Sequence, residues 1–264
     1  MKSMKTKMLV SEIKKAYDTL DVGKASIIYL YSDFRALGAY LNEFDSKDEF
    51  LSAFMSPLLK RDITIIIPSF TYTTSGTFNT EATPTKIGTL NQWVLAQPGR
   101  QRSEHPLFSY AALGPQADIV LNIGKSAFGN DSVFTRLSGR KAAFLHIGRP
   151  VSHGNTTIHH VEQLCGATYR IHMAFQTKVY RGYNYIGTNY TAFLRRRDVP
   201  EYTFAFDFSQ AAQQLYTAGV IRETGQPDKF TNFSFYGYDE ALDFLMKTFF
   251  ENQNVFIGKP FLQY

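Results

Sequence analysis

A chain of 264 residues with 44% hydrophobic content can bury the core of one large domain. It has no apolar run near the roughly 20 residues of a membrane span, and its N-terminal segment lacks a signal-peptide core, so a cytoplasmic protein is expected. The single cysteine excludes an internal disulfide, and the 28 basic residues are too scattered, against 23 acidic ones, to indicate nucleic-acid binding. The net charge of +5 instead favours anionic partners, such as a coenzyme that carries phosphates.

The first half of the chain alternates predicted helices with predicted strands. Amphipathic periodicity predicts the helices, and short apolar or β-branched runs predict buried strands. The Thr-, Ser- and Gly-rich segment 74–85 is expected to be a loop that could border a polar ligand. In chain order, the expected elements are a helix over 8–20, a strand over 26–31, a helix over 50–59, a strand over 63–67, a helix over 90–96 and a strand over 109–113.

A strand–loop–helix unit over residues 142–165 carries the most informative pattern. The apolar run Ala142 to Ile147 is followed closely by glycine and proline, which predicts a short buried strand. Asn155 or Thr156 can cap the helix that comes next, because their side chains accept hydrogen bonds from free backbone amides. Apolar residues then recur at helical spacing, at Ile158, Val161, Leu164 and Cys165.

His159 and Glu162 stand three residues apart and therefore share one face of this predicted helix. A carboxylate in that position can orient an imidazole, which is the arrangement that a general base needs. Two alternatives stand beside this one, because the histidine could satisfy only loop backbone or could bind a metal. His159 and His160 are adjacent, so they point about 100° apart on a helix, and the spacing matches no zinc motif. We therefore expect no metal site.

Beyond this helix the pattern changes from helical to alternating. Polar and apolar residues alternate around the Arg-Gly pair at 181–182, which predicts a β-hairpin extension over 169–197. Two amphipathic helices, over 208–218 and 239–251, are expected as packing layers. No flexible linker separates these parts, so a single domain over residues 1–264 is the simplest interpretation.

A series of motifs occurs in the order found in one enzyme family. Asn155 to Gln163 is similar to the pattern Asn-Thr-x-x-His-x-x-Glu, and Pro68 to Tyr72 to the turn Pro-x-Phe-Thr-Tyr. Thr83 to Leu90 and Arg102 to Gly114 are similar to two further motifs of the series, and Phe128 to Leu137 to another. Together they make the chain resemble the aminoglycoside 3-N-acetyltransferase family.

The resemblance implies a fold and a reaction. The fold is a three-layer αβα arrangement with a central mixed sheet and a small antiparallel β extension. The reaction is acetyl transfer from acetyl-CoA to a primary amine of an amino sugar, without a metal.

This reaction needs a base. The ammonium form of an amine with a pKa of about 8 predominates at neutral pH, so a base must take its proton before the nitrogen can attack. His159 is expected to be that base and Glu162 to orient it. The Thr156 hydroxyl or a loop amide near it is expected to stabilise the thioester oxygen as it becomes negative.

Coenzyme contacts are expected along two segments. The loop from Ser32 to Gly38 resembles the one that follows the first strand in the family, and backbone amides at a helix start can bind phosphate there. Arg102 is expected to contact a phosphate or carbonyl, and Ser103 the pantetheine arm.

Two further expectations concern the acceptor side and the departures from the family. Tyr72 and His105 are expected to contact the acceptor. Tyr31 and Asp33 stand where the family usually has His and Ser, so any contact made by those two side chains differs here.

The region 169–197 suggests which amine is acetylated. It holds six basic residues and no acidic one, with aromatic residues between them and Tyr202 nearby. Guanidinium groups can hold phosphate oxygens while rings stack on sugar or base faces. We therefore expect a nucleotide-linked or cell-surface-polysaccharide amino sugar as the acceptor. The alternatives are an aminoglycoside 3-N-acetyltransferase that confers antibiotic resistance and, from another class, a non-catalytic CoA- or sugar-binding protein. The sequence leaves the oligomeric state open.

Overall fold

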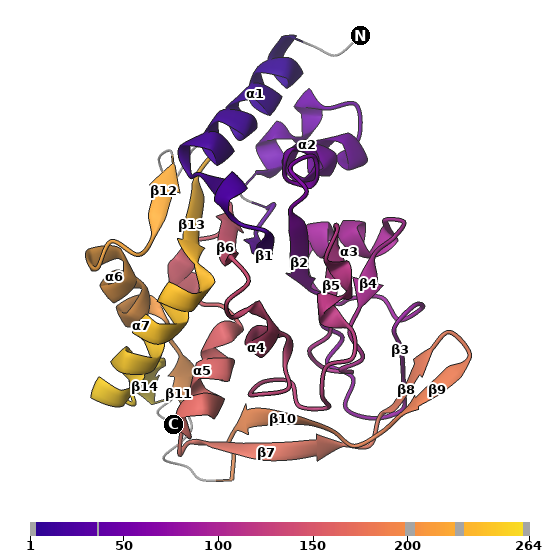
Figure 1. Cartoon of the computed structure of the whole chain (residues 1–264), viewed down its shortest axis with the longest axis vertical. Coiled ribbons are helices and arrows are strands. Elements are labelled where there is room, and N and C mark those ends of the chain that lie inside the picture. Colours follow the sequence, from indigo (N-terminus) through magenta and orange to yellow (C-terminus); the bar gives the residue numbers. More distant parts are fainter. Residues whose placement is uncertain (1–3, 36, 199–203, 225–229, 261–264) are drawn as a thin grey trace.

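The computed structural model describes residues 4–35, 37–198, 204–224 and 230–260, and a seven-stranded sheet lies at its centre (Figure 1). Three parallel strands in the middle of the sheet are flanked by antiparallel strands on both sides. The expected mixed sheet is therefore confirmed. Across the sheet, the strands are β12 (Arg222–Thr224), β13 (Phe233–Gly237), β6 (Ala142–Ile147), β1 (Ile27–Ser32), β2 (Thr64–Pro68), β5 (Tyr110–Leu113) and β4 (Gln101–Arg102).

Helices cover both faces of the sheet and give the expected three layers (Figure 1). Side chains alternate along β1, so that Leu30 joins the core under one layer and Tyr29 the core under the other. Among the helices of the described ranges, none combines the length and hydrophobicity that crossing a membrane requires. The first layer contains α1 (Met4–Thr19), α2 (Lys47–Leu59) and α3 (Thr89–Ala96), and the second contains α4 (Val133–Leu137), α5 (Thr157–Cys165), α6 (Ser209–Thr217) and α7 (Tyr238–Glu251).

Residues 169–197 form two pairs of strands where one hairpin was expected. β7 (Arg170–Phe175) and β10 (Tyr190–Arg195) pair with each other and run along the lower edge of the molecule in Figure 1. Between them, β8 (Lys178–Arg181) and β9 (Asn184–Gly187) make a smaller hairpin around the predicted Arg-Gly turn. β3 (Thr77–Asn79) joins β8 in parallel, so the segment expected to be only a loop contributes a strand.

The remaining elements are short. β11 (Phe204–Phe206) and β14 (Ile257–Pro260) form a separate antiparallel pair near the carboxyl end of the described chain. Turns of 3₁₀ helix follow several of the longer elements and shape the connections between layers. They are η1 (Val22–Lys24), η2 (Gly38–Glu43), η3 (Ala117–Val120) and η4 (Val151–His153).

Candidate active site

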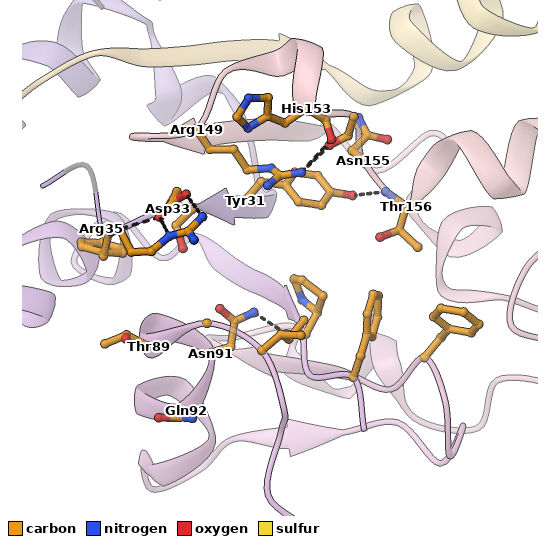
Figure 2. A pocket seen from close by; sticks show the side chains of 18 of the residues that line it. Tyr31, Asp33, Arg35, Thr89, Asn91, Gln92, Arg149, His153, Asn155 and Thr156 are labelled. Carbon is orange, nitrogen blue, oxygen red and sulfur yellow. Dashed lines mark hydrogen bonds and ion pairs between the residues drawn. The ribbon is translucent and has the colours of Figure 1, made fainter. Parts of the chain in front are cut away.

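A pocket of about 780 Å³ lies where the central parallel strands end. β1, β2 and β6 end at the same edge of the sheet, which is where ligands bind in open α/β sheets. The loops that follow these strands line the pocket, together with the start of α3. Figure 2 shows the loop after β6, with Arg149, Asn155 and Thr156, on one side and Asn91 and its neighbours on the other.

The loop between β6 and α5 is shaped by glycine and asparagine. Gly148 has a φ of 61°, and a Cβ there would stand 2.7 Å from the Asp33 carbonyl oxygen, so only glycine fits. The Asn155 carboxamide oxygen accepts from the Thr157 amide at 3.0 Å, and its nitrogen donates to the Tyr236 hydroxyl at 3.0 Å. Asn155 therefore satisfies the first free amide of α5, while the Thr156 side chain makes no capping hydrogen bond.

His159 and Glu162 meet as their spacing predicts. Nδ1 of His159 lies 2.8 Å from Oε2 of Glu162. The imidazole is 25% exposed and lines the pocket, while the carboxylate is fully buried behind it. The rings of Phe128 and Phe206 pack edge-on against the imidazole at 5.4 and 5.8 Å. Because Nδ1 is engaged by Glu162, the other ring nitrogen of His159, Nε2, is the one that can face a ligand.

Two residues of the region 169–197, which the sequence suggested for the acceptor and not for the base, complete the surroundings of Glu162. The Tyr169 hydroxyl donates to Oε1 at 2.9 Å, and Nε of Arg170 forms an ion pair with Oε2 at 2.7 Å. Burial alone would raise the pKa of Glu162, but the hydrogen bond and charge of His159 and the charge of Arg170 lower it overall. The carboxylate is therefore ionised at neutral pH, although it has no contact with solvent.

The surroundings of His159 favour a neutral imidazole. Burial and then the positive charge of Arg170 lower its pKa from the ordinary 6.5, and the contact with Glu162 acts in the opposite direction. An imidazole that is neutral at pH 7 can accept a proton, as a general base must.

The adjacent His160 has a different environment. Its Nδ1 accepts from the Gly129 amide at 3.0 Å, and its ring stacks on Phe134 at 5.3 Å. Burial lowers the pKa of His160 to about 4. Within the part of the chain that the structure describes, no three His, Cys, Asp or Glu residues are grouped as a metal site would need.

Thr156 lines the pocket beside Tyr31 (Figure 2). The Tyr31 hydroxyl accepts from the Thr156 amide at 3.2 Å, so the tyrosine that replaces the family's histidine binds the start of α5. The Thr157 amide is bound by Asn155. The Thr156 hydroxyl lies within hydrogen-bond reach of the Tyr31 and Tyr29 hydroxyls. Its role at the thioester oxygen stays a prediction.

The four residues expected to contact coenzyme lie in different places. Ser32 lines the pocket, but Gly38 is exposed in η2 and does not line it. Ser103 is fully buried, and its hydroxyl accepts from the Tyr110 amide at 2.8 Å. The expected contacts of Gly38 and Ser103 with coenzyme are therefore not supported by their positions.

Arg102 needs the clearest correction, because it is buried and holds the protein together. Its guanidinium donates to the Ser69 carbonyl at 2.8 Å, to the Ser69 and Ser109 hydroxyls at 3.2 Å, and to the Thr83 carbonyl. It also lies 4.9 Å from the centre of the Phe78 ring. Burial lowers the pKa of Arg102 to about 10. The residue joins the loops after β2 and β4 and does not reach the pocket.

We expect Arg102→Met to lower the free energy of unfolding by about 2–3 kcal/mol, because several buried acceptors lose their donor. Coenzyme affinity of the folded variant should be unchanged. Urea unfolding and a binding titration measure the two quantities, with Arg140→Met as the control, since Arg140 is exposed. Weaker coenzyme binding by a stable Arg102→Met variant would restore the original expectation.

Tyr72 and His105 were both expected to contact the acceptor, but only Tyr72 lines the pocket. Tyr72 lines the pocket with a φ of 52°, an uncommon backbone conformation for a residue other than glycine. His105 is buried, with Nε2 donating to the Thr191 carbonyl at 2.9 Å and Nδ1 accepting from the amides of Leu107 and Phe108. Burial lowers the pKa of His105 to about 4. His105 thus connects the loop after β4 to β10 and does not line the pocket.

The charged groups of the pocket are few. Among the described residues that line it, Asp33 is the only carboxylate, and Arg35 and Arg149 are the arginines. Asp33 and Arg35 form an ion pair at 2.6 Å, and Arg35 remains largely exposed. The hydrogen bond from the Arg35 side chain lowers the pKa of Asp33. Arg149 donates to the carbonyls of His153 and Gly154, which fixes the loop before α5.

The basic and aromatic region 169–197 does not form part of the pocket. None of its residues lines it, and several of its arginines have acidic partners, such as Arg181 with Glu104 and Arg196 with Asp198. Tyr183 and Tyr185 are exposed, and Tyr202 lies outside the described residues. Four of the aromatic rings that the sequence offered for stacking are buried: Tyr169, Phe175, Tyr190 and Phe193. The feature that suggested a nucleotide-linked acceptor is therefore a structural part of the molecule.

The sequence matches the family model described as aminoglycoside 3-N-acetyltransferase over residues 32–247. No curated protein matches it at a significant level. The structure is similar to that of aminoglycoside acetyltransferase AAC(3)-IIb, with a TM-score of 0.73 and 18% identity over 92% of this chain and 97% of that one.

Two further structures of similar fold contain ligands. AAC-VIa bound to sisomicin has a TM-score of 0.70 and 16% identity, over 90% of this chain and 96% of that one. AAC-IIIb in a binary complex with CoASH has a TM-score of 0.72 and 15% identity, over 95% of this chain and 98% of that one. At these identities the similarity establishes the fold.

Proposed function

The chain belongs to the aminoglycoside 3-N-acetyltransferase family, and we propose that it acetylates one amino group of an aminoglycoside at the pocket beside His159. Enzymes of this family use acetyl-CoA as the acetyl donor. The single observation that carries the proposal is the pair of His159 and Glu162 at the pocket wall, with Nδ1 and Oε2 2.8 Å apart. The volume of about 780 Å³ is in the range of pockets that hold drug-sized ligands.

His159 acts as the general base in the proposed reaction. Its Nε2 accepts the proton that the amine nitrogen loses as the new C–N bond forms. Glu162 holds Nδ1 and stabilises the imidazolium that results, in the way a carboxylate supports a catalytic histidine elsewhere. When the C–S bond breaks, the same proton can pass from His159 to the thiolate, which leaves a free thiol and an amide.

The carbonyl oxygen of the thioester becomes negative during attack and needs a hydrogen-bond donor. Thr156 is our candidate, since its hydroxyl lines the pocket three residues before His159 on the same loop and helix start. No nucleophilic side chain is needed for a direct attack. Cys165 is half-buried on the far end of α5, and burial raises the pKa of its thiol, which suits a packing role.

The pocket residues fit a coenzyme with phosphates at one end. Arg35 and Arg149 both line the pocket, and Arg35 is largely exposed at its mouth. Guanidinium groups can bind phosphate oxygens through two hydrogen bonds. Asp33, between them, offers a carboxylate that an ammonium group of the acceptor could contact. The solved structures of similar fold have been bound to sisomicin and to CoASH, which supports the same two classes of ligand here.

An aminoglycoside replaces the nucleotide-linked amino sugar as our preferred acceptor. The family favours it, and the basic region that suggested a nucleotide lies away from the pocket. A role in polysaccharide synthesis has no support from either finding.

A thiol-release assay tests this function. The enzyme is incubated with acetyl-CoA and, in separate reactions, a 2-deoxystreptamine aminoglycoside, a nucleotide-linked amino sugar and a simple amine. We expect the aminoglycoside to give the highest kcat/KM and His159→Gln to abolish most of the release. A preference for the nucleotide-linked sugar would support the first hypothesis about the acceptor instead. Binding of coenzyme without release of thiol in the presence of any amine would favour a non-catalytic binding protein.

A further inference from the structure

Arg170 lies beside the candidate base without lining the pocket. It is the first residue of β7 and its side chain is only 8% exposed. Its three nitrogens contact three different groups: Nε lies 2.7 Å from Oε2 of Glu162, Nη2 lies 2.9 Å from Nδ1 of His159, and Nη1 donates to the Phe193 carbonyl at 3.0 Å. β10 thus fixes the guanidinium against both members of the pair.

The contact with Nδ1 has a chemical consequence. A guanidinium can only donate hydrogen bonds, whereas Nδ1 donates when it carries a proton and accepts when it does not. Nδ1 therefore either donates to Glu162 or accepts from Arg170. The first state leaves Nε2 with a free lone pair, as a base requires, and the ionised Glu162 carboxylate 2.8 Å from Nδ1 favours it. The second state places the proton on Nε2. In both of these states the imidazole is neutral.

Arg170 also opposes the charged form of the imidazole. A third state, with protons on both nitrogens, would bring two positive groups within 2.9 Å of each other. The other groups near the ring do not compensate for this. Phe128 and Phe206 are uncharged, and Tyr169 donates its hydrogen bond to the far oxygen of Glu162.

The charge around the pair agrees with this geometry. Glu162, on the same helix, is the one acidic group that the described residues place against the imidazole, and Arg170 neutralises it. Arg195 is the partner of Arg170 in the β7–β10 register, and its pKa is lowered first by burial and then by the charges of Arg197 and Arg170. Across the pocket, Asp33 is engaged by Arg35 and has Arg149 near it. Among these groups around the pocket, positive charges therefore outnumber negative ones.

We propose that Arg170 is a positioning residue of the active site, which holds the Glu162 carboxylate in place and keeps His159 neutral and able to accept a proton in mildly acidic solution. The inference rests on the proposed function of His159 as the base. It assigns to the start of β7 a role that the motif on α5 does not contain.

The pH dependence of kcat/KM tests the proposal with two variants. Arg170→Met removes the charge, so we expect the acid limb of the profile to shift to higher pH by about one unit. On the acid side of the limb, kcat/KM should then be about tenfold lower than in the wild type. Arg170→Lys keeps a positive charge and should leave the limb near its wild-type position. A purely structural role would lower the rate at all pH values without moving the limb, and that result would overturn the proposal.

A titration of the unliganded protein by NMR separates this proposal from the proposed function. With histidines labelled and the His159 signal assigned from His159→Gln, its pKa should be higher in Arg170→Met than in the wild type. This readout does not depend on whether any amine is acetylated. Equal pKa values would refute the role of Arg170, even if the enzyme acetylates an amine. A shifted pKa would support that role, even if the protein acetylates none of the amines tested.

The same comparison works if Arg170→Met does not fold. Glu162→Gln and the double variant Glu162→Gln/Arg170→Met differ only by the guanidinium, and the double variant buries neither charge. We expect the pKa of His159 to be higher in the double variant. Identical values in the two would show that Arg170 has no effect on the base.

Discussion

Replacement of His159 by alanine is expected to lower kcat/KM by about a hundredfold to ten-thousandfold, the usual loss when a positioned base is removed. The imidazole lines the pocket and Glu162 holds it from behind, so no neighbouring group can take its place. Binding of acetyl-CoA should change little, because the residues at the pocket mouth are untouched. Steady-state kinetics and a coenzyme titration measure both effects.

His153→Ala is the matched control for this prediction. His153 also lines the pocket, but its side chain is exposed, and it is the His153 backbone carbonyl that accepts a hydrogen bond from Arg149. We expect this variant to keep turnover within a few-fold of wild type. If His159→Ala kept wild-type turnover while binding acetyl-CoA normally, His159 would not be the base.

The same histidine sets the expected pH profile. Its pKa lies below the ordinary 6.5, because burial and Arg170 disfavour the charged form. The free enzyme should therefore lose activity only below about pH 6.5, as the imidazole becomes protonated.

The fold was predictable where local pattern decides structure. The strand over 142–147 and the helix after Asn155 were found from a short apolar run, a cap and helical spacing. β13 was missed, although it pairs with β6 in the middle of the sheet. β12 precedes it closely in the chain, but β6 comes from a distant part, so the place of β13 in the sheet depends on tertiary contacts that five residues do not reveal.

The candidate site divides in the same way. His159 and Glu162 share a helix, and helical geometry alone brings residues three apart together. Arg170 begins the next strand and Tyr169 lies in the turn just before it, and no spacing rule relates either residue to Glu162. Arg102 shows the opposite error, because an arginine in a loop motif suggests an exposed ligand contact. Its burial follows from the close approach of two distant loops, which sequence does not display.

Glu162 shows how the structure changes an expectation drawn from sequence. The motif alone predicts that Glu162→Gln lowers turnover and leaves the fold intact. In the fold, however, the carboxylate is fully buried and accepts from Tyr169 while it neutralises Arg170. A glutamine keeps the shape but not the charge. Arg170 would then be a buried cation without its counter-ion.

We therefore expect Glu162→Gln to lower the free energy of unfolding at pH 7 by about 3–5 kcal/mol, the usual effect of removing one partner of a buried ion pair. Turnover should also fall, by about a hundredfold, because the amide does not stabilise a protonated His159 as the carboxylate does. Denaturant unfolding measures the first effect, and kinetics at a temperature where the variant is folded measure the second. Glu240→Gln, at an exposed position on α7, should change neither.

The stability difference should also depend on pH. The pKa of Glu162 is lower in the folded protein than its ordinary 4.5, so the carboxylate stabilises the fold fully above that value and progressively less as the pH falls through its folded pKa. Unfolding curves of wild type and Glu162→Gln should accordingly converge in acid. A difference that is absent at pH 7, or that stays constant down to pH values well below the ordinary pKa, would mean that the charge of Glu162 does not hold Arg170 and His159 together.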